Sequence, residues 1–459
     1  MYTISLKPQK IAPVKTKFRT IKTTIPSSSF IKTFSKLSKY EPQSLLAMIG
    51  KLPVLWDRAV DFQVFDKDGN CWIDFTSTIF VANTGHANPR IAAALKSQLA
   101  KPLLHSYTYA TDIKAEFLEK LIKVTPKFCE RAILFSGGSE ATEAAFLMMK
   151  AHGKSIDKSR TGIISFEGAM HGVTMASQML SGNSEVLSAY GYSDPTVYRL
   201  PFPFPWDDAR YSGAERFKKD ISVLIRKGMK VKNIAGFMVE AYRGWGVIFY
   251  PSGYVKALVN FARQNNILVA FDEIQGGFGR TGKIFTFQHY DVVPDLVLVG
   301  KGLSSSLPLS AVLGRKEIFN GADSLDVYHS THSGNPLSCA AGLANLEELE
   351  SKNLVKESAR KGKILLNRLN VLKKKYKDRI AYVNGKGLIA AVLFKDPQTG
   401  KPDGEFASRV CERAMQKGLL LVHTGRESIK IAPPLTILDA ALREGIHVFS
   451  ESIAEISVI

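Results

Sequence analysis

The 459-residue sequence predicts an α/β fold: a large domain with a mainly parallel sheet covered by helices on both faces, and a smaller α+β domain. From about residue 85 to 330, apolar runs of strand length alternate with longer amphipathic stretches, a pattern typical of parallel strands joined by helices. After residue 336, a long charged helix is expected before short strands interleaved with helices. The hydrophobic content of 45% is enough to bury the cores of more than one domain.

The first expected element is a hairpin, because segments 62–65 and 71–75 flank Asp68-Gly69-Asn70, where Asp-Gly favours a tight reversal. Strands of the large sheet are expected at 132–135, 162–166, 234–239, 267–271, 296–299 and 310–313. Amphipathic stretches predict helices between several of them, such as those at 139–151 and 252–264. The last part of the chain predicts helices from Pro336 and at 355–376, 405–417 and 438–456, with strands at 388–394, 419–422 and 428–431.

The formal charge of +19 is concentrated at the N-terminus, where residues 1–40 hold nine basic residues and no acidic one. We expect this segment to be a flexible arm or a partly ordered lead-in to the first helix. A cleaved organelle-targeting peptide is an alternative, although such peptides favour arginine and this segment favours lysine. No interleaved aromatic stripe or recognition motif accompanies the charge, so nucleic acid is not expected as a partner.

The four cysteines are widely spaced and follow no pairing or metal-ligand pattern. We therefore expect no disulfide framework and no metal site, but buried thiols in a reducing cytoplasm. No apolar run approaches the roughly 18 residues of a membrane span, and the N-terminus lacks the apolar stretch of a secretory signal. A membrane is therefore not expected as a partner.

Two residues at the ends of apolar runs indicate the chemistry. Asp272 ends the run 267–271, and Lys301, 29 positions later, follows the run 296–299 and Gly300. A lysine and a carboxylate at the ends of two buried strands can hold pyridoxal 5′-phosphate (PLP). The amine condenses with the cofactor aldehyde as a Schiff base, and the carboxylate keeps the pyridine nitrogen protonated. Either residue alone is as well explained as a surface lysine or a turn aspartate.

The surrounding motifs carry a family resemblance. Segment 271–282, FDEIQGGFGRTG, resembles the fingerprint of the class III (omega) aminotransferases, as does VGKGL at 299–303 with LPLSAV at 307–312. The likeness runs from about Asp66 to Asp439. It implies a fold type I PLP enzyme and a homodimer with shared active sites. We expect a basic arm at 1–40, an N-terminal segment of the small domain at 41–84, a large PLP-binding domain at 85–335, and a linking helix with the C-terminal small domain at 336–459.

By this resemblance, Gly138 and Ser139 hold the cofactor phosphate, because their loop opens a helix whose first N–H groups face an anion. The family usually has asparagine and serine where this chain has Ser136 and Gly137. A tight turn with a serine N-cap is the alternative. Gln275 is expected to contact the phenolic oxygen of the cofactor. Thr331 is expected to reach the phosphate of the neighbouring subunit, with helix capping before Pro336 as the alternative.

The substrate side departs from the family pattern. Met170 stands where an aromatic residue commonly stacks on the cofactor ring, and its thioether covers a ring less rigidly. Val173 stands where several members that act on amino acids with a distal amine carry arginine. Near the C-terminus, Lys430 holds the common arginine position, with Arg426 nearby, and lysine lacks the planar two-point grip. Glu240 corresponds to a family glutamate that positions a partner or the substrate.

The resemblance implies an aminotransferase that moves an amino group from an amine or amino-acid donor to a carbonyl acceptor. An aminomutase on the same scaffold and a non-catalytic binding protein are the alternatives. The motif at 279–282 and Gln275 look more like those of the transaminases. The identities of donor and acceptor stay open.

Overall fold

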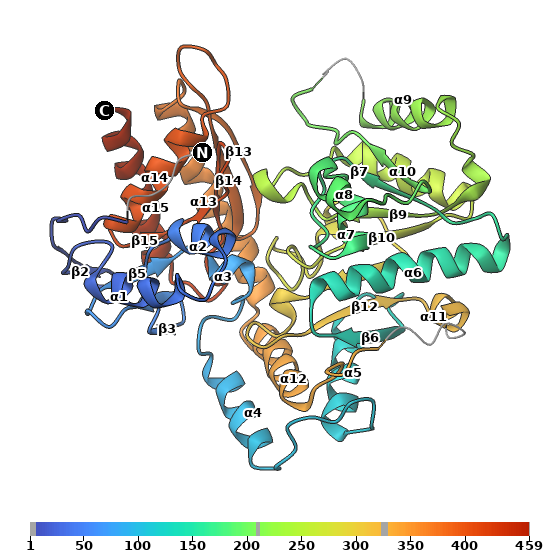
Figure 1. Ribbon diagram of the computed structural model, residues 1–459, viewed down its shortest axis with the longest axis horizontal. Helices are drawn as coiled ribbons and strands as arrows, with labels where there is room; N and C mark the ends of the chain where they lie inside the picture. Colours follow the sequence, from blue (N-terminus) through green and yellow to red (C-terminus); the bar gives the residue numbers. More distant parts are fainter. Residues whose placement is uncertain (1–5, 208–211, 323–328, 459) are drawn as a thin grey trace.

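The computed structural model describes residues 6–207, 212–322 and 329–458, and Figure 1 shows them as two groups of elements. One group holds the middle of the chain, and the other holds its two ends. Within the described residues, no helix combines the length and the apolar character that a membrane crossing requires.

The middle of the chain forms a seven-stranded sheet in the order β6-β12-β11-β10-β9-β7-β8. All its strands run parallel except β12, which is antiparallel to both of its neighbours. The strands are β6 (Arg131–Phe135), β7 (Gly162–Phe166), β8 (Val197–Leu200), β9 (Ile234–Glu240), β10 (Leu268–Asp272), β11 (Leu296–Val299) and β12 (Ser310–Gly314). The predicted α/β class and the six predicted strands are confirmed.

The edge strand β8 was not predicted, because only its two end residues are buried and its short sequence lacks a continuous apolar run. The inner strands differ in this respect. Every residue of β7, β9, β10, β11 and β12 is buried, as expected where both faces of a parallel sheet are covered.

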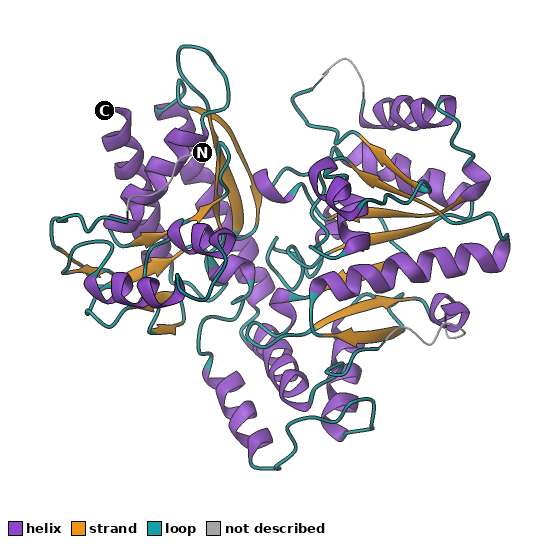
Figure 2. Cartoon of the chain, viewed as in Figure 1, coloured by secondary structure: helices purple, strands orange, loops and turns teal. Residues whose placement is uncertain are grey.

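Figure 2 shows helices on both sides of the central sheet. Alternating residues of the inner strands pack on its two faces. On β9, Phe237 and Val239 join the main core, which includes Leu258 of α10 (Ser252–Gln264). Met238 joins a second cluster with Met148 of α6 (Gly138–Ile156). The other helices of this part are α5 (Asp112–Val124), α7 (Met175–Ser181), α8 (Ser184–Tyr190), α9 (Gly213–Arg226) and α11 (Lys316–Ala322).

The two ends of the chain meet in the second group of elements. Strand β5 (Cys71–Asp74) pairs with β15 (Leu419–Leu420), in a sheet completed by β1 (Val14–Lys15), β2 (Thr20–Ile21), β3 (Arg58–Val60) and β4 (Gln63–Phe65). The predicted hairpin is confirmed as the antiparallel pair β4 and β5. A four-stranded sheet lies beside it in the order β13 (Ile380–Lys386), β14 (Ile389–Phe394), β17 (Ser428–Ile431) and β16 (Val422–His423). Strand β13 was not predicted, because all of its residues but the first are only half buried.

Helices α13 (Leu354–Lys375), α14 (Gly404–Gln416) and α15 (Asp439–Ser457) pack on these sheets, within a few residues of the predicted bounds. Helix α12 (Pro336–Ser351) links the two groups and packs on α4 (Pro89–Leu99) and α5. The remaining helices are α1 (Ser28–Leu37), α2 (Gln43–Gly50) and the short α3 (Ser77–Phe80). The division of the chain at residues 40, 84 and 335 stays a prediction.

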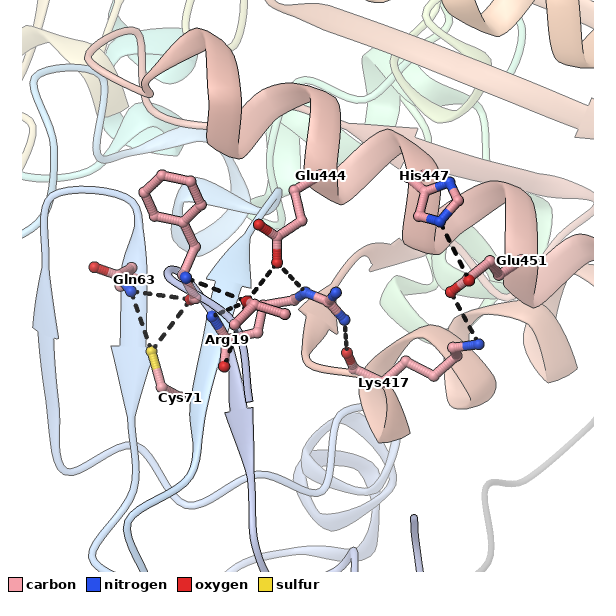
Figure 3. A network of polar contacts seen from close by, with 9 residues as sticks. Arg19, Gln63, Cys71, Lys417, Glu444, His447 and Glu451 are labelled. Carbon is pink, nitrogen blue, oxygen red and sulfur yellow. Dashed lines mark hydrogen bonds and ion pairs between the residues drawn. The ribbon is translucent and has the colours of Figure 1, made fainter. Parts of the chain in front are cut away.

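Part of the basic N-terminal segment packs on this region, which agrees with the expected partly ordered lead-in and not with a flexible arm. Figure 3 shows Arg19, whose Nε lies 2.6 Å from Oε1 of Glu444 on α15 and whose guanidinium also donates to the carbonyl oxygen of Lys417. Lys417 in turn pairs with Glu451 at 3.0 Å and Glu455 at 2.7 Å. Arg19 of the N-terminal segment and Lys417 near the C-terminus therefore both pair with carboxylates of the last helix, α15.

Candidate active site

Three neighbouring strands of the central sheet end in charged residues at the same edge. Glu240 ends β9, Asp272 ends β10 directly opposite it, and Lys301 follows β11 after Gly300. Ligands of parallel α/β sheets collect at this edge because the carboxyl ends of the strands meet there. Lys301 has a φ of 43°, a left-handed conformation that is uncommon for a residue with a side chain and that clusters at functional sites.

The Asp272 carboxylate is held from two sides. Its Oδ2 lies 2.8 Å from Nδ1 of His171, and its Oδ1 accepts a hydrogen bond from the Ile274 N–H at 3.1 Å. Because an ionised carboxylate only accepts hydrogen bonds, Nδ1 carries the proton in this contact. The His171 backbone is fixed in turn by Thr142, whose hydroxyl donates to the His171 carbonyl oxygen at 2.7 Å.

The Lys301 amine lies inside the pocket. Burial lowers the pKa of Lys301, and the nearby Asp272 carboxylate partly opposes that decrease. A larger fraction of the amine is therefore neutral at neutral pH than for a lysine in water, and the neutral form is the nucleophile.

The loop before α6 is shaped by small residues. Gly137 is the N-cap, and its N–H donates to Oε2 of Glu140 at 2.6 Å. A Cβ on Gly138 would lie 3.0 Å from the Ile274 side chain. Ser139 accepts a hydrogen bond from the Val173 N–H at 3.1 Å, which ties the start of the helix to the following loop. Gly138 and Ser139, in the first turn of α6, line the same pocket as Lys301, and the first N–H groups of a helix have no partner within the helix.

A pocket of about 850 Å³ opens between the end of the central sheet and the four-stranded sheet. It is lined by most residues that the sequence singled out: Gly138, Ser139, Met170, Glu240, Asp272, Gln275, Lys301 and Lys430. Two side-chain atoms at the cofactor end are buried without a hydrogen-bond partner among the described residues: Oε1 of Gln275 and Nε2 of His171. Buried polar atoms without partners are expensive, so these two are poised for a polar ligand.

The pocket also carries three other charged groups, Glu240, Arg243 and Lys430. Glu240 accepts a hydrogen bond from Nη1 of Arg243 at 3.3 Å, and burial raises the pKa of Glu240 while the Arg243 charge lowers it. On β17, Nζ of Lys430 lies 4.5 Å from the centre of the Phe80 ring. Burial lowers the pKa of Lys430 to about 8, the charge of Lys301 adds to this decrease, and Glu240 opposes it.

Phe80 belongs to a turn with an unusual backbone. The four residues Ser77, Thr78, Ile79 and Phe80 have φ values of 47°, 50°, 59° and 71°, which is left-handed. Such conformations cost roughly 1–3 kcal/mol each where a side chain is present. The turn is anchored by Ser77, whose hydroxyl donates to the Ala432 carbonyl oxygen at 2.6 Å. It places Ile79 in the pocket wall and Phe80 beneath Lys430.

Comparison with known proteins agrees with this geometry. Residues 48–453 match the model of the class III aminotransferases. The chain belongs to this family. This class III aminotransferase is 32% identical to the 4-aminobutyrate aminotransferase GabT of Escherichia coli over 434 residues, which cover 92% of this chain and 98% of that relative. It is 30% identical to the ornithine aminotransferase of Emericella nidulans, over 88% of this chain and 87% of that relative.

Solved structures of transaminases share the fold of this class III aminotransferase. A transaminase from directed evolution by ancestral reconstruction is 26% identical with a TM-score of 0.85, over 93% of this chain and 99% of that one. An amine transaminase from an uncultivated Pseudomonas species, in its PLP-bound form, is 27% identical with a TM-score of 0.81, over 87% and 94%. The protein is therefore a PLP-dependent aminotransferase with fold type I.

The pocket of this aminotransferase fits PLP. The cofactor has a phosphate, a phenolic oxygen, a ring nitrogen and an aldehyde. The pocket offers a group for each of these: the start of α6 at Gly138 for the phosphate, the carboxamide of Gln275 for the phenolic oxygen, the Asp272 carboxylate for the ring nitrogen and the Lys301 amine for the aldehyde. Among the described residues, the Gln275 carboxamide oxygen has no hydrogen-bond partner, so no contact of that oxygen prevents the carboxamide from turning its N–H toward the phenolic oxygen.

One residue expected at this site, Arg426, lies elsewhere. Arg426 lines a separate cavity of about 290 Å³ next to the main pocket, where its guanidinium stacks 4.1 Å from the Trp245 ring. It is exposed on a turn of the small domain, so proximity in sequence to Lys430 did not bring it into the main pocket. Thr331, which is expected to act in the site of a neighbouring subunit, is exposed and lines neither cavity of its own chain, so its role stays a prediction. The cap of α12 is instead Asn335, whose side chain accepts from Leu337 and Ser338.

Two other functional candidates were missed by the sequence pattern. His171 was used only to locate Met170, and its contact with Asp272 across 101 positions has no local signal. Arg243 lies three residues after Glu240, and this short spacing is the feature of the sequence from which the ion pair could have been predicted. The two departures from the family pattern, Met170 and Val173, both line the pocket, and their side chains are 60% and 68% exposed.

Proposed function

We propose that this aminotransferase takes donors whose amine is remote from a carboxylate, and that Lys430 holds that carboxylate. The observation that carries the proposal is Lys430 itself, a buried cation that faces the pocket and has no ion pair among the described residues. Its neighbours on β14 and β16, Ala391 and Val422, are uncharged, so no carboxylate of the sheet neutralises it. The names of the relatives, 4-aminobutyrate, 5-aminovalerate and ornithine aminotransferases, support the same class of donor.

We assign the chemical step to Lys301. PLP, when bound, supplies an aldehyde that bonds to amines and a ring that withdraws electrons. With PLP bound, Nζ of Lys301 would take the proton from the donor carbon that bears the amine and would deliver it to the cofactor carbon that is bonded to the same nitrogen. The low pKa caused by burial keeps this nitrogen able to accept a proton.

Asp272 holds the proton on the ring nitrogen, and His171 orients Asp272. The His171 N–H donates to one carboxylate oxygen and the Ile274 N–H to the other, so the carboxylate cannot rotate freely. Gln275 donates to the phenolic oxygen, and Met170 covers one face of the ring. At the start of α6, the N–H groups of Gly138 and Ser139 and the hydroxyl of Ser139 would hold the phosphate.

Thr331 completes the phosphate site of a second copy, so the enzyme is a homodimer with shared active sites. Supporting this, Leu104, Tyr107 and Tyr109 are exposed, and the Tyr107 ring lies 6.0 Å from the ring of His329, two residues before Thr331. The Asn335 side chain donates to the Leu104 carbonyl oxygen at 2.9 Å, and the rings of His105 and His332 lie 5.4 Å apart. A monomer rarely leaves several large apolar side chains exposed together, and a partner subunit would cover them.

The dimer is tested with mixed subunits. A Lys301→Ala chain paired with a Thr331→Ala chain has one site with both lesions and one with neither. We expect about half of the wild-type number of active sites to return, by symmetry of the dimer. If activity does not exceed that of the two parent variants, Thr331 does not act across the subunit boundary.

The donor class is tested with pairs of donors that differ by one carboxylate, such as 5-aminovalerate and butylamine. Loss of the cofactor absorbance measures the half-reaction directly. Lys430→Met should lower the rate with 5-aminovalerate by about tenfold or more and change butylamine little, because a charge pair in a desolvated site is lost. Equal rates for both donors in the wild type would favour an amine transaminase without carboxylate recognition.

We place the enzyme in the cytoplasm. The four cysteines are free and buried in the structure, which suits a compartment that keeps thiols reduced.

A further inference from the structure

Arg243 and Glu240 form an ion pair that is buried at the wall of the pocket. Their side chains are 4% and 6% exposed, and Nη1 lies 3.3 Å from Oε2. The second oxygen of Glu240 accepts from the Gly244 N–H, also at 3.3 Å. Both oxygens of the glutamate are therefore engaged by the turn that follows its own strand.

Arg243 is itself held in place by contacts outside the pocket. Its guanidinium donates to the Glu167 carbonyl oxygen and stacks 4.6 Å from the centre of the Phe202 ring. Its backbone pairs with Ile248 in both directions, at 2.8 and 3.2 Å. A guanidinium that is fixed by an aromatic face and a carbonyl oxygen loses little freedom when it binds a carboxylate.

Lys430 lines the same pocket as Glu240. The two side chains are close enough for the Glu240 charge to raise the pKa of Lys430. If Glu240 turned toward Lys430, the pair would neutralise the cation that is proposed to hold the donor carboxylate. An internal carboxylate has a high effective concentration, so it would displace a donor from Lys430.

We infer that Arg243 determines donor specificity by holding Glu240 away from Lys430, which keeps Lys430 free for the donor carboxylate. Arg243 acts through Glu240 and is a positioning residue. This inference rests on the proposed role of Lys430 and extends it, since it names the residue that keeps the cation available.

The test measures binding of pentanoate and of the neutral pentanamide to the PLP-loaded enzyme by calorimetry, which does not require turnover. Arg243→Gln should weaken pentanoate binding about tenfold, the scale of one buried charge pair, and leave pentanamide unchanged. Adding Glu240→Gln should restore pentanoate binding to within about twofold, because no carboxylate then remains to occupy Lys430. A merely structural role for Arg243 would give no such rescue.

Arg243→Lys covers the case in which Arg243→Gln does not fold. It keeps a charge but loses the two-point grip, so pentanoate binding should weaken part of the way and should again be restored by Glu240→Gln. Lys256→Gln is the matched control, since it breaks an exposed pair with Asp291 outside the pocket and should change neither ligand.

The outcomes separate the inference from the proposed function. If Lys430→Met weakens pentanoate but Arg243→Gln and Arg243→Lys do not, Lys430 binds the carboxylate and the inference about Arg243 is wrong. The inference also fails if the double variants bind as weakly as the single ones. If Lys430→Met leaves pentanoate unchanged, the proposed carboxylate site itself is wrong.

Discussion

The two ends of the pocket are built in different ways. At the cofactor end, Asp272 and Lys301 are placed by β10 and β11, two adjacent strands of the central sheet. Every residue of these two strands is buried. At the substrate end, Ile79, Arg243 and Lys430 come from three segments far apart in the chain, and two of these are turns. Strands that are buried on both faces hold a reacting group with little freedom, whereas turns accept changes in sequence. The chemistry therefore depends on the sheet, and the choice of donor depends on the segments that meet it.

Breaking the cofactor end should have the largest effect. Lys301→Ala removes the amine that bonds to the cofactor, and we expect multiple turnover to fall by at least about a thousandfold. PLP should still bind noncovalently. Borohydride reduction followed by mass measurement reports the covalent bond. Normal turnover together with borohydride-fixed cofactor in this variant would reassign the lysine.

Asp272→Asn should have a smaller but still large effect, because it keeps the shape and removes the anion. The half-reaction should slow by about a hundredfold, the scale of losing one preorganised electrostatic partner. Stopped-flow absorbance with excess donor measures this rate. His171, which donates to Asp272, should retain its place, so an unchanged rate in the loaded variant would exclude the assigned role.

The substrate end should respond to pH through Lys430. Burial lowers the pKa of this lysine to about 8, so it is cationic below that pH and neutral above it. Pentanoate affinity should be full below pH 8 and should fall by up to about tenfold per pH unit above it. Glu240 and Lys301 face Lys430, and His423 on β16 stays neutral in this range because burial lowers its pKa to about 4.

Lys430→Arg distinguishes the titration of Lys430 from the titration of other groups in the pocket. Arginine stays charged at these pH values, so pentanoate affinity should no longer fall above pH 8. The same fall in the arginine variant would assign the pH dependence to another group of the pocket.

Val173→Arg should have the smallest effect of the set. The residue lines the pocket but is 68% exposed, so an added guanidinium is screened by water. We expect the ratio of half-reaction rates for 5-aminovalerate and butylamine to rise by about threefold, the scale of an exposed ion pair. An unchanged ratio in a folded, PLP-loaded variant would remove residue 173 from donor selection.

Local patterns in the sequence were enough to predict the inner strands, two site residues and the hairpin. The strands β9, β10 and β11 are continuous apolar runs because both of their faces are buried, and such runs stand out in a sequence. Asp272 and Lys301 were found because they end two of these runs, and parallel strands bring their ends together. The hairpin around Asp68 and Gly69 followed from turn chemistry in the same way.

Contacts between residues that lie far apart in the chain could be known only from the fold. Arg426 and Lys430 are four positions apart, yet the structure puts one beside Trp245 and the other in the pocket. The contact of His171 with Asp272 and the anchoring of Arg19 by Glu444 join residues that no local pattern relates. Arg243 faces Glu240 because the turn after β9 is held by Phe202 and the Glu167 carbonyl oxygen. The physical reason is that propensity and periodicity act over a few residues, whereas charge pairing and burial act between whatever side chains the packed chain brings together.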